Sequence, residues 1–107
     1  MDVADRIAEQ VLSWEGVTTH AHRFGGVEFR LGKRELGHRL ADLPFPRRIR
    51  DELVAAGRAR PHHVLPESGW VSRTIAGPED VDEVVALFRL SYERAAAARA
   101  RSSEADM

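Results

Sequence analysis

The sequence predicts a single α+β domain with two layers, in which an antiparallel sheet of about five strands carries helices on one face, in the order α-β-β-β-α-β-β-α. Apolar residues recur at helical spacing near both ends of the chain, and between these ends they alternate with polar residues. The chain has 107 residues, 43% of them hydrophobic, which suits one core of ordinary size. We place the domain at residues 1–99 and expect a polar, disordered tail at 100–107.

A first helix is expected from residue 3 to about residue 13, because apolar residues spaced by four, four and three positions lie on one side of a helix. These residues are Val3, Ile7, Val11 and Trp14. Three strands follow at 17–23, 27–31 and 35–40, separated by turns at 25–26 and 32–34. Short turns between consecutive strands predict a meander.

The second half begins with Pro44 and Pro46, which end the third strand and start a helix over 46–56. Two short strands at 62–65 and 70–75 are expected to form a hairpin around the turn at 66–69. The segment 77–80 starts a last helix that should run to about Arg99. In the helix at 46–56, the side chains of Arg47, Arg48 and Arg50 should face solvent.

The predicted core joins one face of the sheet to the apolar sides of the three helices. On the strands it contains Val27, Phe29, Leu31, Val71 and Ile75. On the helices it contains Ile7, Val11, Ile49, Leu53, Val84, Val85 and Phe88.

Composition excludes several classes of protein. The absence of cysteine excludes disulfides, a thiolate nucleophile and cysteine-based metal centres. No apolar stretch is long enough to cross a bilayer and no apolar leader opens the sequence, so we expect a cytoplasmic protein with no membrane partner. The net charge is -1, and basic residues outnumber acidic ones only between residues 30 and 60, which does not favour a nucleic-acid partner.

His62 and His63 are candidates for acid–base chemistry, because imidazole titrates near neutral pH. Neighbours on a strand point to opposite faces, so at most one of them would face a pocket. A metal site would need a third ligand, such as His38, His20 or Glu35, and no known metal-binding spacing is present. We therefore expect no metal site and no cofactor.

The strand at 35–40 carries a second pair of candidates, Glu35 and His38. Strict alternation places them on opposite faces, unless a bulge at Gly37 reverses the alternation. Glu28 and Arg30 share a face two residues apart, which favours an ion pair on the outer side of the sheet over a clamp for a substrate carboxylate.

Three segments carry a family resemblance: HRFGGVEFRLGKRELGH at 22–38, LPFPRRIRDELVAAG at 43–57 and ARPHHVLPESGWVS at 59–72. In this order they resemble the luciferase-domain family, small bacterial proteins of unassigned activity that share a domain with fungal luciferases acting on a hydroxylated pyrone. The family usually has a longer segment after the Gly-His pair, which here is Gly37-His38, so a pocket lined by that segment would be reduced. The chain also resembles the YjbR-like small domains, which implies a similar two-layer fold.

The resemblance implies a pocket between sheet and helices that binds a small aromatic or anionic molecule. The candidate catalytic residues are His38, His62 and His63, and the candidate ligand-binding residues are Trp70, Arg30 and Glu35. If two of these histidines face one pocket, repulsion and burial should lower the pKa of at least one. The alternative is a non-catalytic module that contacts nucleic acid or an acidic protein through the basic helix at 46–56. The chain is expected to be a monomer or a homodimer.

Overall fold

The computed structural model describes residues 2–22, 26–38 and 41–105, and it has the predicted α+β class. Along these residues the elements are α1 (Val3–Leu12), β1 (Val17–Ala21), β2 (Val27–Leu31), β3 (Arg34–His38), β4 (Asp42–Pro44), α2 (Arg47–Ala55), β5 (Arg60–Pro61), β6 (Trp70–Ser72), the 3-10 turn η1 (Pro78–Asp80) and α3 (Val81–Ala105). The strand β4 is additional to the predicted order.

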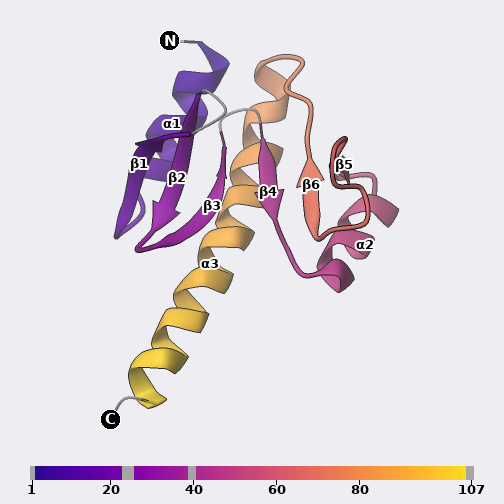
Figure 1. Cartoon of the computed structure of the whole chain (residues 1–107). Helices are drawn as coiled ribbons and strands as arrows, with labels where there is room; N and C mark the ends of the chain where they lie inside the picture. The colour runs from indigo at the N-terminus through magenta and orange to yellow at the C-terminus, as the bar shows by residue number, and fades with distance from the viewer. Residues whose placement is uncertain (1, 23–25, 39–40, 106–107) are drawn as a thin grey trace.

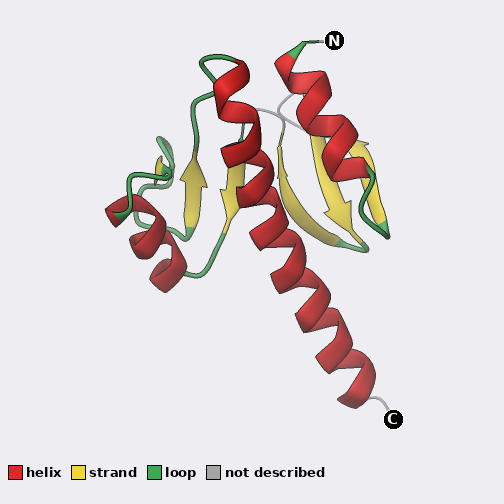
Figure 2. Cartoon of the chain, turned by 180° about the vertical axis from the view of Figure 1, so that it is seen from behind, coloured by secondary structure: helices red, strands yellow, loops and turns green. Residues whose placement is uncertain are grey.

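The strands form two antiparallel three-stranded sheets, with orders β1-β2-β3 and β4-β6-β5. Figure 1 shows the strands side by side as one curved layer, with β3 next to β4. From behind, α1 and α3 cover one face of this layer, and α2 lies beside the second sheet (Figure 2). The predicted arrangement of helices on one face is therefore confirmed, with the sheet divided in two.

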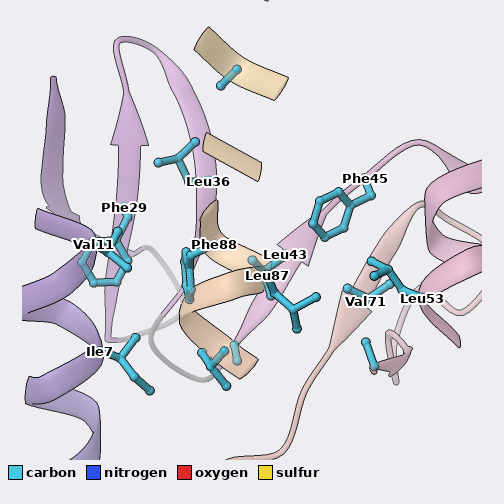
Figure 3. Packing of buried hydrophobic residues seen from close by; sticks show 14 of the residues in the cluster. Ile7, Val11, Phe29, Leu36, Leu43, Phe45, Leu53, Val71, Leu87 and Phe88 are labelled. Atoms are coloured by element: carbon cyan, nitrogen blue, oxygen red, sulfur yellow. The ribbon is translucent and has the colours of Figure 1, made fainter. Parts of the chain in front are cut away.

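The core fills the space between the sheets and the helices α1 and α3 (Figure 3). Phe29 of β2 meets Phe88 of α3 edge to face, with ring centroids 5.4 Å apart. The predicted core residues that are fully buried are Ile7, Val11, Phe29, Leu31, Leu53, Val71, Val84 and Phe88. The other four, Val27, Ile49, Ile75 and Val85, are half-buried.

Several predicted boundaries are wrong. The segment 62–65 is not a strand, because the strand that pairs with β6 is β5. Pro44 lies within β4, where it is tolerated because β4 is an edge strand. The strand at 70–75 ends at Ser72. The predicted turn at 25–26 and the end of the third strand at 39–40 fall at least partly outside the described residues.

The last helix is longer than predicted. It continues past Arg99 to Ala105, so the expected tail is helical over most of its length. Figure 1 shows this C-terminal part of α3 extending beyond the sheets. Among the described residues, no helix is both long and apolar enough to cross a lipid bilayer.

The helix α2 presents a smaller basic face than predicted. Arg47 and Arg48 are exposed, as expected. Arg50 is not, because its guanidinium donates hydrogen bonds to the carbonyl oxygens of Pro66 and Ser68 at 2.8 and 2.9 Å. Arg50 therefore ties α2 to the turn that precedes β6.

Candidate functional site: a polar face of the sheet

A β-bulge in β3 builds the candidate site. The register between β2 and β3 shifts after Phe29, so that Phe29 pairs with Gly37 while Arg30 pairs with Glu35. Leu36 is the extra residue, and its side chain is fully buried. Its carbonyl oxygen, which a bulge can leave unpaired, accepts a hydrogen bond from the buried Ser91 hydroxyl of α3 at 3.0 Å.

Gly37 is required at this bulge for two reasons. Its φ is +149°, a conformation that residues with a side chain rarely adopt. A Cβ at this position would also lie 2.8 Å from both the Asp42 carbonyl oxygen and a ring carbon of Phe88. Strict alternation would place Glu35 and His38 on opposite faces, and the exception that the sequence allowed, a bulge beside Gly37, places them on one face.

Glu35, His38 and His22 form a compact cluster on the face opposite the core. His38 Nδ1 lies 2.9 Å from Glu35 Oε1, and His22 Nε2 lies 3.7 Å from the same oxygen. The two imidazole rings have centroids 3.8 Å apart. His22 reaches this position because its backbone N–H bonds to Gly26 and so extends the pairing of β1 with β2.

Carboxylates dominate the electrostatics of this cluster. The contact with Glu35 raises the pKa of His38 above its ordinary value, with burial opposing it, and the charges of Asp42 and Glu28 act in the same direction as Glu35. The expectation of a lowered histidine pKa is therefore wrong for His38, because its closest ionisable contact is an acid. Arg30, 2.7 Å from Glu28, lowers the pKa of that carboxyl. The predicted Glu28–Arg30 ion pair is confirmed.

Trp70 connects the cluster to the second sheet. Its ring centroid lies 5.5 Å from that of His38 and 6.2 Å from that of His62. The structure therefore brings together three residues that the sequence singled out. Trp70 is half-buried, so it forms part of the surface of this face.

His62 is fixed in one orientation by its neighbours. Its Nδ1 accepts the backbone N–H groups of Val64 and Leu65, both at 3.2 Å. In the neutral ring the proton is therefore on Nε2, which lies 3.6 Å from Asp42 Oδ2. The other oxygen of Asp42 accepts a hydrogen bond from the Ser72 hydroxyl at 2.6 Å.

His63 does not join the site. It is exposed and stacks on His62, with ring centroids 4.7 Å apart. The expectation that His62 and His63 face opposite sides is wrong, because this segment is a turn rather than a strand.

Sequence reasoning missed two residues of the site, His22 and Asp42. His22 could have been found by continuing the period-two alternation of β1 from His20, which lies on the same face two residues earlier. His20 itself is exposed and contacts the Thr18 hydroxyl at 2.9 Å. No signal marked Asp42, since the prediction ended the preceding strand before it.

Core side chains fill much of the space between the sheets and the helices, where the sequence predicted a pocket. A shallow cavity of about 430 Å³ lies between residues 57–60 and 72–74, and another of about 250 Å³ lies beside α3. Neither is lined by Glu35, His38 or Trp70. Over residues 2–22, 26–38 and 41–105, the candidate site is therefore described as a polar face of the sheet.

Comparison with known proteins agrees with the resemblance seen in the sequence. The family described as Luciferase domain matches residues 33–91, more than half of the chain. The match includes Glu35, His38, His62 and Trp70, and His22 lies outside it. No curated protein and no solved structure matches the chain. The chain belongs to the luciferase-domain family.

Proposed function

We propose that the chain binds a small hydroxylated aromatic molecule on the polar face formed by Trp70, His38, His62, Glu35 and Asp42. The observation that carries this proposal is the convergence of Trp70 with His38 and His62 from three separate segments. The rings of Trp70 and His38 are 32° from parallel, so they offer a planar ligand two aromatic surfaces.

The charges of this face favour a hydroxylated ligand over an anionic one. The carboxylates of Glu28, Glu35 and Asp42 surround the histidines and would repel an anion. The same carboxylates accept hydrogen bonds from phenolic or enolic hydroxyl groups. The implied kinship with enzymes that act on a hydroxylated pyrone is consistent with this choice.

Within this proposal the predicted site residues have different roles. Trp70 contacts the ring, and Glu35 accepts a hydroxyl. His38 and His62 exchange a proton with a bound hydroxyl, whereas His63 is exposed and stacks on His62. Arg30 acts through Glu28, which it holds at 2.7 Å.

Tryptophan fluorescence tests the proposal. In a Trp14→Phe background Trp70 is the sole tryptophan, and 4-hydroxy-6-methyl-2-pyrone should quench it saturably. The matched ligand 6-methyl-2-pyrone, which lacks the hydroxyl, should bind at least tenfold more weakly, about 1.4 kcal/mol. Calorimetry should show loss of pyrone binding in Trp70→Leu and no change in His63→Ala. Equal affinity for both pyrones, or binding that survives Trp70→Leu, would refute the proposal.

The alternative of a basic binding helix loses part of its support, because Arg50 is occupied by Pro66 and Ser68. The dependence of binding on salt concentration distinguishes the two functions. Pyrone binding should change little with added salt, whereas contact with a phosphate backbone through Arg47 and Arg48 should weaken steeply.

A further inference from the structure

The cluster of His22, Glu35 and His38 combines ligand atoms from two chain segments: His22 follows β1, and Glu35 and His38 lie on either side of the bulge in β3. One ligand atom from each of the three residues lies within 4.8 Å of the other two. The specific contacts are 2.9 Å between His38 Nδ1 and Glu35 Oε1, and 3.7 Å between His22 Nε2 and Glu35 Oε1. We propose that these three side chains bind a divalent transition-metal ion of the kind that prefers imidazole and carboxylate ligands, such as Zn²⁺ or Fe²⁺.

The spacing of the donor atoms fits such an ion. Zinc lies about 2.0 to 2.2 Å from imidazole nitrogen and carboxylate oxygen. Two ligand atoms on one ion are therefore roughly 3 to 3.5 Å apart in tetrahedral or octahedral geometry. The two observed contacts, 2.9 and 3.7 Å, lie just below and just above this range, so small rotations of the side chains complete the coordination.

The two potential metal-ligand atoms that lie closest together do not form a good hydrogen bond with each other. Glu35 Oε1 and His38 Nδ1 are buried atoms, and neither makes a properly directed hydrogen bond within the described part of the chain, despite their 2.9 Å separation. A buried polar atom without a well-aligned partner costs free energy. A cation between them would bond to both atoms at once.

The surrounding charges also favour a cation. Glu28 pairs with His38 across the β2–β3 ladder, and its carboxylate is on the same side of the sheet. Asp42 approaches from β4. Arg30, bound to Glu28, offsets part of this charge within the described part of the face. With the histidines in the neutral form that binds metal, the described charged side chains here, three carboxylates and one arginine, leave a negative charge that a divalent ion can balance.

The backbone holds the three ligands in place without help from the ion. The bulge at Gly37 fixes Glu35 and His38 on one face, and Ser91 holds the Leu36 carbonyl between them. The side chains of His22, Glu35 and His38 are 13%, 20% and 17% exposed, so an ion can reach them from solvent. Three protein ligands leave at least one coordination position for water or another ligand.

Calorimetry with Zn²⁺, and visible absorbance with Co²⁺ as a spectroscopic probe, test this proposal on the full chain. We expect one equivalent of Zn²⁺ to bind saturably. His22→Gln, Glu35→Gln and His38→Gln should each weaken binding at least tenfold, the usual minimum effect of disturbing a metal site. Zn²⁺ should raise the melting temperature of the wild type and not that of His22→Gln.

His20→Gln is the matched control, since His20 lies on the same strand and face as His22 but outside the cluster. It should keep wild-type affinity within twofold. An equal loss in His20→Gln, or no saturable binding below about 1 mM Zn²⁺, overturns the proposal. His22→Gln changes a residue beyond the end of β1, so it remains a usable variant if Glu35→Gln does not fold.

The metal site goes beyond the proposed function and does not rest on it, but it shares Glu35 and His38 with the proposed ligand site, so variants of residues that belong to one site alone distinguish the two. Trp70→Leu should abolish pyrone binding and leave Zn²⁺ affinity unchanged, because Trp70 is not a metal ligand. His22→Gln should weaken Zn²⁺ binding, and Zn²⁺ binding by the wild type does not require any pyrone. A chain that binds Zn²⁺ but not the pyrone supports the metal site alone.

Discussion

The two sheets of this domain are held together in different ways. The strands β1, β2 and β3 have five residues each and pack beneath α1 and α3. The strands β4, β5 and β6 have only two or three residues. In this second region, polar side chains supply long-range bonds: Arg50 to the turn at 66–68, Arg73 to Arg58, and Ser72 to Asp42. The first region depends on repeated apolar packing, whereas the second adds individual polar contacts to a smaller set of buried apolar residues that includes Leu43, Leu53 and Val71.

The largest expected effect is in the first region, at Phe88. Phe88 is fully buried against Phe29, so Phe88→Ala should lower the free energy of unfolding by about 3 to 5 kcal/mol. Urea denaturation measures this loss. Val64→Ala is the control, because Val64 is 65% exposed and should cost under about 0.5 kcal/mol. A similarly small loss at Phe88 would mean that α3 does not pack on β2 as described.

The next effect is at the bulge that joins the core to the polar face. Gly37→Ala combines an unfavourable φ with contacts to Asp42 and Phe88, and it should cost roughly 2 to 3 kcal/mol. Gly57→Ala is the matched control, since Gly57 has φ +73° and open space around its Cβ position. It should cost only about 1 to 2 kcal/mol of backbone strain.

The same substitution should disturb the site more than the fold. If the bulge is lost, Glu35 and His38 return to opposite faces, and NMR should show the largest shifts at these two residues. An equal stability loss at positions 37 and 57, with unchanged His38 signals, would contradict the role given to Gly37.

The difference between the two regions also explains which parts of the fold the sequence could predict. Periodicity predicted the first region well, because Ile7, Val11, Phe29 and Phe88 satisfy a repeating apolar pattern. It misplaced the strand at 62–65, because the short edge strand β5 follows no pattern and is defined by its pairing with β6. The sequence predicted too early an end for the last helix, because the residues of its final turns are polar and form no apolar stripe at helical spacing.

The candidate site was only partly predictable, because it too depends on an irregular part of the fold. Trp70, His38, His62 and Glu35 were identified by residue type and by family resemblance. Their convergence depends on a bulge, and the sequence offered Gly37 as a candidate without determining the register. Alternation is a property of regular strands, and the site lies where the strand is irregular.

A smaller effect is expected in the second region, at Arg50. Arg50→Ala removes two hydrogen bonds from a charged donor to the carbonyls of Pro66 and Ser68, and it should cost about 1 to 2 kcal/mol. Hydrogen exchange should speed up in the turn at 66–69 and stay unchanged in β2. Arg48→Ala, which alters an exposed neighbour on the same helix, should have little effect. Faster exchange throughout the chain would show that the two regions open together.

The smallest expected effect is at Asp80 in the second region, and it appears as a loss of stability in acid. The Arg73 guanidinium, 2.9 Å away, and the backbone N–H groups of Ala76 and Gly77 hold the pKa of Asp80 below its ordinary value of 3.8. Because the folded state favours the ionised carboxyl, this stabilisation is present above about pH 4 and is lost as the pH falls through the folded pKa.

Urea denaturation between pH 7 and about pH 2.5 should therefore show a steeper loss of stability for the wild type than for Asp80→Asn, which lacks the titrating group. Asp82→Asn is the control, because Asp82 is exposed in the first turn of α3, next to η1, and this variant should leave the acid dependence as it is in the wild type. Hydrogen exchange in acid should rise first around β5, β6 and the start of α3, where Arg73 and Asp80 join the chain segments. Parallel acid profiles for the wild type and Asp80→Asn would show that this pair does not stabilise the second region, which would then depend on its apolar contacts as the first region does.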